Sequence, residues 1–141
     1  MIRIFLNSSV LFAASYLQTS SSRDLFRLAI RGRVQIVISE QVSVEAEANL
    51  TKKAPQALAA FLDLLSLIVP EVSANPTLEE LQHAAAYIHL KDAPIVAAAI
   101  KAGVDYLATW DRKHFLDDPK VAKRSGLRIV TPDELVDLIR A

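Results

Sequence analysis

The chain contains no cysteine, so disulfide bonds, thiolate zinc sites and cysteine nucleophiles are excluded. Its three glycines, Gly32, Gly103 and Gly126, stand far apart and form no glycine-rich phosphate loop. No apolar run approaches the roughly 18 residues that a membrane-spanning helix needs. The first residues do not have the pattern of a secretory signal, because a short apolar run gives way at once to asparagine and serine. We therefore expect a cytoplasmic protein with no membrane contact.

An excess of charge of either sign is also lacking, because 16 basic residues are balanced by 16 acidic ones. This balance neither requires nor excludes a nucleic-acid partner, since a neutral protein can still carry a basic face. Hydrophobic residues make up 52% of the 141 positions, which is enough to form a buried core. From this length and composition we expect one domain over residues 1–141.

Short apolar segments alternate with helical patterns along the whole chain. We predict strands at residues 2–6, 34–38, 66–70, 105–109 and 127–131. We predict helices at residues 8–18, 22–31, 41–52, 55–65, 75–88, 92–102, 118–125 and 131–140. Such alternation is typical of βαβ units with right-handed crossovers. The sequence therefore predicts an α/β fold, a three-layer α/β/α sandwich around a parallel sheet of about five strands.

Oxygen-bearing side chains gather at one edge of this predicted sheet. Asn7 ends the first strand, and Asp111 follows the strand at residues 105–109. Asp92 begins the helix before that strand, and Glu45 lies in the early turns of the helix after the second strand. The carboxyl ends of parallel strands share one edge, where ligands bind. Clustered carboxylates without cysteine or histidine ligands suit hard cations, so we expect Mg²⁺ or Mn²⁺ there.

Each of these residues also has a simpler interpretation. Asp92 and Asn7 could serve only as helix caps, for which both residue types are favoured. Asp111 could be a loop residue that accepts backbone hydrogen bonds, and Glu45 could be a solvated helix residue. Only their joint placement on one edge favours a metal site.

Several segments resemble the PIN domain, a family of metal-dependent ribonucleases. The most specific is "KDAPIVAAAIKAGVDYLATWDRKHF" at residues 91–115, which is similar to the third and fourth acidic motifs of the family. The segment "VISEQVSVEAEANL" at residues 37–50 resembles the second motif. The resemblance extends from "IFLNSSVLFAA" to "RIVTPDELV" and implies a doubly wound α/β/α fold, often dimeric.

The resemblance implies a role for each matching residue. Glu45, Asp92 and Asp111 would bind Mg²⁺ or Mn²⁺, and Thr109 would support the last carboxylate. Small prokaryotic members resemble the VapC toxins of toxin–antitoxin pairs. The implied function is therefore a metal-dependent endoribonuclease with an RNA substrate, an antitoxin as possible partner and a homodimeric state.

Asn7 stands where the first motif of the family has aspartate. An amide oxygen can bind a cation, but it has no formal charge and cannot act as a base for the attacking water. We expect weak metal binding and slow or absent hydrolysis. The chain could be an engineered inactive form, a natural member with reduced activity, or an inactive module that binds RNA or an antitoxin.

Basic residues for RNA binding follow the last carboxylate directly. They lie in residues 112–128, and the candidates are Arg112, Lys113, Lys120, Lys123 and Arg124. Trp110 could stack on an unpaired base, or it could equally cover the edge of the core or a dimer contact. A phospho-acceptor signalling domain is a weaker alternative, because Asn7 stands at the strand end where an acceptor aspartate is needed.

Overall fold

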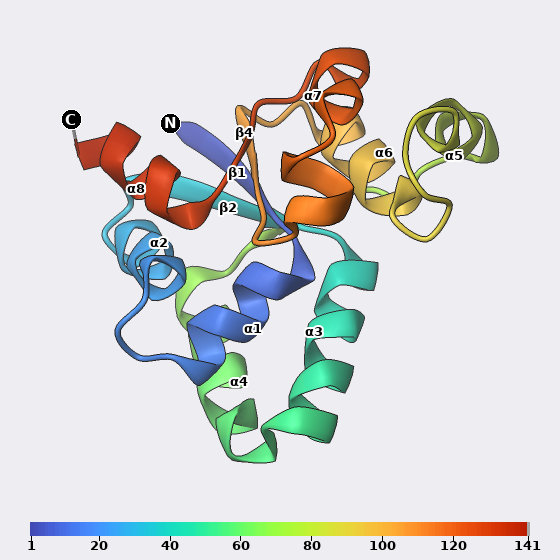
Figure 1. Cartoon of the computed structure of the whole chain (residues 1–141). Coiled ribbons are helices and arrows are strands. Elements are labelled where there is room, and N and C mark those ends of the chain that lie inside the picture. Colours follow the sequence, from blue (N-terminus) through green and yellow to red (C-terminus); the bar gives the residue numbers. More distant parts are fainter. Residues whose placement is uncertain (141) are drawn as a thin grey trace.

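The sheet at the centre of the molecule is entirely parallel. The computed structural model describes residues 1–140, and the strands are β1 (Ile2–Leu6), β2 (Val34–Ile38), β3 (Glu71–Val72), β4 (Tyr106–Ala108) and β5 (Ile129–Val130) (Figure 1). Their order in the sheet is β3-β2-β1-β4-β5. The central strand β1 pairs with β2 from Ile2 opposite Val34, and with β4 from Ile4 opposite Tyr106. The predicted α/β fold with a five-stranded parallel sheet is confirmed.

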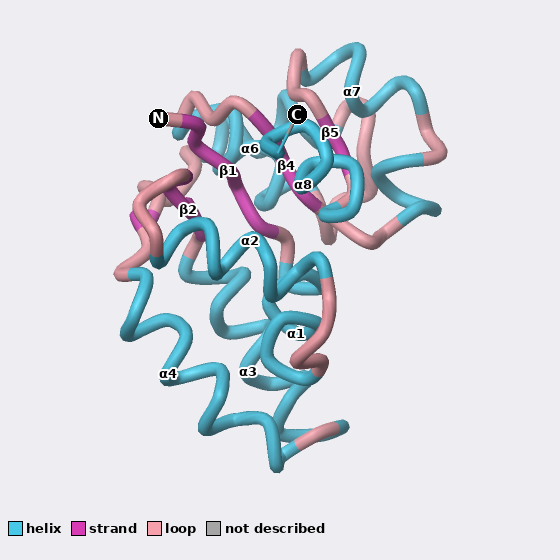
Figure 2. Tube along the Cα trace, turned by 90° about the vertical axis from the view of Figure 1, so that its left-hand side faces the viewer, coloured by secondary structure: helices cyan, strands magenta, loops and turns pink. Residues whose placement is uncertain are grey.

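Helices cover the two faces of the sheet in separate groups. One group contains α1 (Ser8–Tyr16), α2 (Ser21–Ile30), α3 (Glu40–Lys53), α4 (Leu58–Ile68) and α8 (Pro132–Arg140), with the short η1 turn (Pro55–Ala57) between α3 and α4. The other contains α5 (Leu78–Ala85), α6 (Ala93–Ala102), the π-helical turn η2 (Arg112–Leu116) and α7 (Pro119–Ser125). Figure 2 shows the strands between these groups. Within residues 1–140, none of the helices is long and apolar enough to cross a membrane.

The core is built from the strands and the apolar faces of the helices. Ile4, Phe5 and Leu6 of β1 are fully buried, as expected for a central strand covered on both faces. From α6, Val96, Ala98 and other small residues pack against the same core. Such short side chains let a helix approach the sheet closely, so α6 brings its N-terminal end to the carboxyl edge of the strands.

The predicted strand at residues 66–70 is wrong. Helix α4 continues through Ile68, and the strand beside β2 is the short, exposed segment Glu71–Val72. Phe61, Leu64, Leu65 and Ile68 all pack on the core, and their spacing of i, i+3, i+4 and i+7 is helical. The apolar run therefore continued the helical period, and the chain turns only at Val69, which has a φ of 45°.

The direction in which the chain winds reverses between β1 and β4. From β1 the chain proceeds outward to β2 and β3, then returns through α5 and α6 to β4 and continues to β5. Crevices at such a reversal point lie at the carboxyl ends of the two strands. Asn7 follows β1 and Thr109 follows β4, so both stand at this position.

Candidate functional site

Asn7 and Thr109 join the two central strands at the crevice. Both residues are buried, and Nδ2 of Asn7 donates to Oγ1 of Thr109 over 3.0 Å. Oδ1 of Asn7 accepts from the backbone N–H of Ser8 over 2.8 Å and caps α1. Oγ1 of Thr109 also accepts from the backbone N–H of Asp111 over 3.0 Å. Thr109 thus hydrogen-bonds to both Asn7 and Asp111. Its place beside Asp111 is compatible with the expectation that it supports the last carboxylate.

Asp111 caps the π-helical turn that follows β4. Its Oδ1 accepts from the backbone N–H of His114 over 3.0 Å, and its Oδ2 lies 3.1 Å from Nδ1 of the same histidine. His114 is not among the residues predicted for the metal site, and from the sequence it is more often a surface or packing residue than a phosphate contact. Its position three residues after Asp111 is a weak signal, because many residues at this spacing from a helix cap make no such contact; here the helical turn brings the imidazole back to the carboxylate.

Asp92 stands at the start of α6, but its side chain makes no capping hydrogen bond. Its Oδ2 instead lies 3.9 Å from Nδ1 of His114, and 18% of the side chain is exposed. Burial raises the pKa of the Asp92 carboxyl above its ordinary value; His114 opposes this rise, and the negative charge of Asp111 adds to it. A carboxylate that is neither capping nor paired at close range is available to a ligand.

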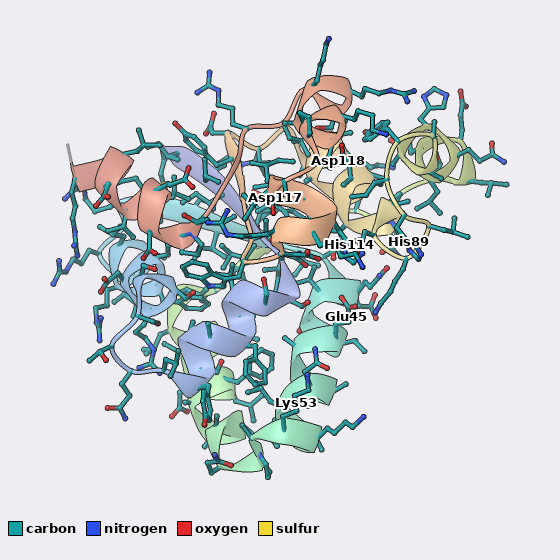
Figure 3. All side chains as sticks on the ribbon, viewed as in Figure 1. Glu45, Lys53, His89, His114, Asp117 and Asp118 are labelled. Atoms are coloured by element: carbon teal, nitrogen blue, oxygen red, sulfur yellow. The ribbon has the colours of Figure 1, made fainter. Side chains whose placement is uncertain are left out.

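The carboxylates and imidazole line one cleft of about 420 Å³. Its walls contain all four residues predicted for the metal site, together with others that were not predicted: Ser8, Ser9, Asn49, His89, Lys91 and His114. Figure 3 shows Glu45 on α3 facing the region where His114 and His89 lie. The fold thus brings Asn7, Glu45, Asp92 and Asp111 to one cleft from four separate segments of the chain.

Three groups in this cleft are spaced as metal ligands. One ligand atom each from Asp92, Asp111 and His114 lie within 4.8 Å of one another. Bonds of about 2.1 Å allow ligand atoms up to about 4.2 Å apart around one ion, so a small side-chain rotation would bring all three into range. The two carboxylates suit Mg²⁺ or Mn²⁺, whereas the imidazole departs from the oxygen-only set expected from the sequence, because imidazole is a ligand that Zn²⁺ or Fe²⁺ prefers. The residues present therefore fit a divalent cation.

The basic residues predicted to contact RNA lie on η2 and α7 and do not line this cleft. The guanidinium of Arg112 lies 3.6 Å from the carboxylate of Asp117. Arg124 donates to the carbonyl of Ala86 over 3.3 Å and stacks 5.1 Å from the centre of the Tyr87 ring. Arg124 therefore lines a separate, larger hollow of about 600 Å³, away from the carboxylates. We place the candidate site in the smaller cleft because the titratable groups converge there.

Without metal, Asp92→Asn is expected to stabilise the fold near neutral pH. The pKa of Asp92 is raised in the folded chain, so its ionised form is disfavoured there. The stability that this carboxyl contributes at low pH is therefore lost as the pH rises through the raised pKa. The amide removes this cost. Calorimetry in chelator should show a Tm higher by about 1–4 °C, a difference that shrinks as the pH falls toward about 4. Asp63→Asn, at an exposed position of α4, is the control. An equal shift for both variants would contradict the role of burial at Asp92.

Comparison with known proteins agrees with this architecture. A family model described as the PIN domain matches residues 3–113, whereas no curated protein sequence matches the chain significantly. The structure of PAE2754 from Pyrobaculum aerophilum is similar at a TM-score of 0.70 and 20% identity, over 99% of this chain and 90% of that chain. VapBC2 from Rickettsia felis, bound to a DNA fragment from its promoter, is similar at 0.65 and 18% identity, over 92% and 98%.

A third similar structure is VapC20 from Mycobacterium tuberculosis, a toxin that cleaves the sarcin–ricin loop. Its TM-score is 0.57 at 18% identity, with 78% of this chain and 91% of that chain covered. At such identities the likeness shows a shared fold, and the family rests on the sequence model. That model spans from the second residue of β1 to the second residue of η2, and it includes every residue that lines the candidate cleft except His114. The chain belongs to the PIN-domain family.

Proposed function

We propose that the chain is a metal-dependent endoribonuclease of the VapC toxin type, with activity reduced by Asn7. The observation that carries the proposal is the carboxylate of Asp92. It is mostly buried, makes no capping hydrogen bond and lies in one cleft with Asp111, His114 and Glu45. A helix cap or a solvated residue would have neither this burial nor these neighbours.

The residues of the cleft have separable roles in this proposal. When bound, Mg²⁺ or Mn²⁺ supplies an activated water and stabilises the leaving oxygen. Asp92 and Asp111 would hold the cation, with Glu45 on the opposite wall. His114 orients Asp111, since it contacts both carboxylate oxygens through its backbone and its ring. Lys91 offers a positive charge to an RNA phosphate at the mouth of the cleft.

One observation favours the second candidate, an inactive module that binds RNA or an antitoxin. The amide oxygen of Asn7 already accepts the capping bond of α1, and its NH₂ group is directed at Thr109. A cation would have to share that oxygen with the N–H of Ser8. This geometry makes Asn7 a weaker metal ligand. The two candidates therefore differ in whether the chain cleaves RNA: the nuclease does, and the inactive module does not.

The similar structures also suggest partners. VapBC2 is a pair assembly bound to promoter DNA. By analogy we propose an antitoxin as partner of this chain, a homodimeric state and a cytoplasmic location, with residues 1–141 acting as one domain. Arg112, Lys113, Lys120 and Lys123 remain candidates for wider phosphate contacts, because all four are exposed and the first two directly follow Asp111.

A cleavage assay with and without metal tests the proposal. The chain should cut single-stranded or structured RNA slowly with Mn²⁺ or Mg²⁺, and a chelator should abolish the cut because the carboxylates cannot activate water alone. Product analysis on a gel checks this, and titration calorimetry should show Mn²⁺ binding at millimolar levels or below. Cleavage that persists in chelator would contradict the proposal. RNA binding without cleavage in any metal would favour the inactive module.

A further inference from the structure

A second hollow of about 280 Å³ opens directly beside the candidate cleft. It is lined by Ser8, Ser9, Phe12, Asn49, Lys53 and Trp110. Ser8, Ser9 and Asn49 also line the cleft itself, so the two hollows adjoin each other. We call this hollow the α1–α3 groove. The lining of the groove is predominantly apolar, whereas that of the cleft is predominantly polar. The groove therefore suits a ligand group with an apolar surface.

Two parallel rows of side chains form the walls of the groove. Ser8 and Phe12 follow one another at a spacing of four on α1, while Asn49 and Lys53 do so on α3. Glu45, one turn before Asn49 on the same row of α3, lines the adjoining cleft. Residues four apart lie on one helix face, and α1 packs against α3. From Glu45 to Lys53 the row extends about 12 Å along the helix axis. Figure 3 shows Lys53 near the lower end of α3 and Glu45 in the upper half of the helix.

The aromatic wall of the groove is fixed in place. Nε1 of Trp110 donates to Oγ of Ser22 over 2.9 Å, and the backbone N–H of Trp110 donates to Oγ of Ser9 over 3.1 Å. Trp110 is half-buried against the core, which fits the prediction that it covers the core edge. Its remaining surface still faces the groove. Phe12 also lines the groove, and its ring packs against that of Tyr16, with 5.8 Å between the ring centres.

We propose that the α1–α3 groove binds the unpaired nucleotide next to the phosphate in the cleft. The base would lie against Trp110 and Phe12, the amide of Asn49 would meet polar atoms of the base or ribose, and Lys53 would pair with the next phosphate. Aromatic faces with a cation at the far end are the pattern of single-strand nucleic-acid binding. The inference rests on the proposed function, because it takes the cleft to hold a phosphate. It names a single-stranded RNA segment as the ligand of the groove.

Fluorescence of Trp110, the single tryptophan of the chain, gives a direct measurement. A short single-stranded RNA should quench the Trp110 fluorescence. The measurement is made in Ca²⁺, which takes oxygen ligands and so stands in for Mg²⁺ or Mn²⁺ in the cleft. An abasic oligonucleotide of equal charge should bind at least about tenfold more weakly and quench little, since stacking is lost. Equal affinity and equal fluorescence change for both oligonucleotides would overturn the proposal.

Matched variants separate the groove from general electrostatics. Lys53→Gln should weaken binding of RNA and reduce the salt slope by about one, because one phosphate contact is lost. Lys52→Gln removes a charge from the neighbouring exposed residue, which does not line the groove, and should leave the affinity nearly unchanged. Phe12→Leu keeps apolar volume but removes the aromatic face, and should lower the affinity for RNA toward that for the abasic strand. Equal effects of the two lysine variants would contradict the groove.

The outcomes also distinguish this inference from the proposed function. Quenching that depends on the base and on Lys53, in a chain that never cleaves RNA, supports the groove and rejects the nuclease. Cleavage without any base-dependent quenching rejects the groove and keeps the nuclease. Melting curves of each variant confirm that a changed affinity is not caused by unfolding.

Discussion

Replacing Asn7 by aspartate is expected to raise metal affinity by about 30-fold and RNA cleavage by at least as much. One unit charge about 4 Å from a dication contributes about 2 kcal/mol even in water-like surroundings, and about 1.4 kcal/mol corresponds to a tenfold change. The new carboxylate would also be able to take a proton from the attacking water, which an amide cannot do. Affinity and rate should therefore rise together.

The surroundings of Asn7 are already suited to this change. Thr109 carries a hydroxyl, which can reverse its role and donate to a carboxylate where it now accepts from the amide of Asn7. The other carboxylate oxygen can still cap α1 through the N–H of Ser8. Aspartate is as good a helix cap as asparagine, so the substitution should cost little stability.

Calorimetry with Mn²⁺ and initial rates of RNA cleavage measure the two effects. Asn75→Asp, at an exposed position before α5, adds the same charge outside the cleft and serves as the control. If Asn7→Asp and the original chain show the same near-zero cleavage and the same Mn²⁺ affinity, the deficit does not lie at Asn7. The inactive-module interpretation would then be preferred.

In the Asn7→Asp background, Asp92→Ala is expected to abolish the restored activity, with a loss of more than about a hundredfold. Even residues that only support metal ligands contribute about 10–100-fold, and Asp92 is proposed as a ligand itself. Asp92 is a better choice for this test than Asp111. The Asp92 side chain makes no capping bond, whereas Asp111 caps η2 through the N–H of His114. The loss can therefore be assigned to the missing ligand.

Cleavage rates and Mn²⁺ titrations of the double variant check this prediction. Asp117→Ala in the same background is the matched control, since it also removes one carboxylate, and Asp117 pairs with Arg112 outside the cleft. Activity that survives Asp92→Ala would point to a contaminating nuclease or to a different site. An equal loss in both double variants would show a general effect of charge near η2.

The sequence was sufficient for the central strands because their apolar runs are short and bounded by turns or caps. The sequence wrongly predicted a strand at residues 66–70, because a short apolar run there fits a strand as well as the last turn of a helix. Tertiary packing determines the helix here, because Leu65 and Ile68 pack against the core as part of the continued α4. The helical spacing of Phe61, Leu64, Leu65 and Ile68 is present in the sequence, but only the packing shows that it outweighs the strand-like apolar run.

The candidate site shows the same limit. Asn7, Glu45, Asp92 and Asp111 could be placed on one edge, because strand ends and helix starts are readable from local patterns. His114 could not be placed at the site from the sequence, because it lies in a π-helical turn, and such turns are rare and hard to predict. That Asp92 is not used as a cap also depended on its surroundings, because its position suits a cap equally well.

The pairing of β1 with β4 also has a consequence for protein synthesis. Asn7 and Thr109, which hydrogen-bond across the crevice, are 102 residues apart along the chain. During translation β1 is made first and can pair with β2, but its other edge stays open until β4 has emerged. Such distant contacts form late in folding. A ribosome-bound chain therefore has no assembled cleft until residue 111 and the π-turn after it have emerged from the ribosome.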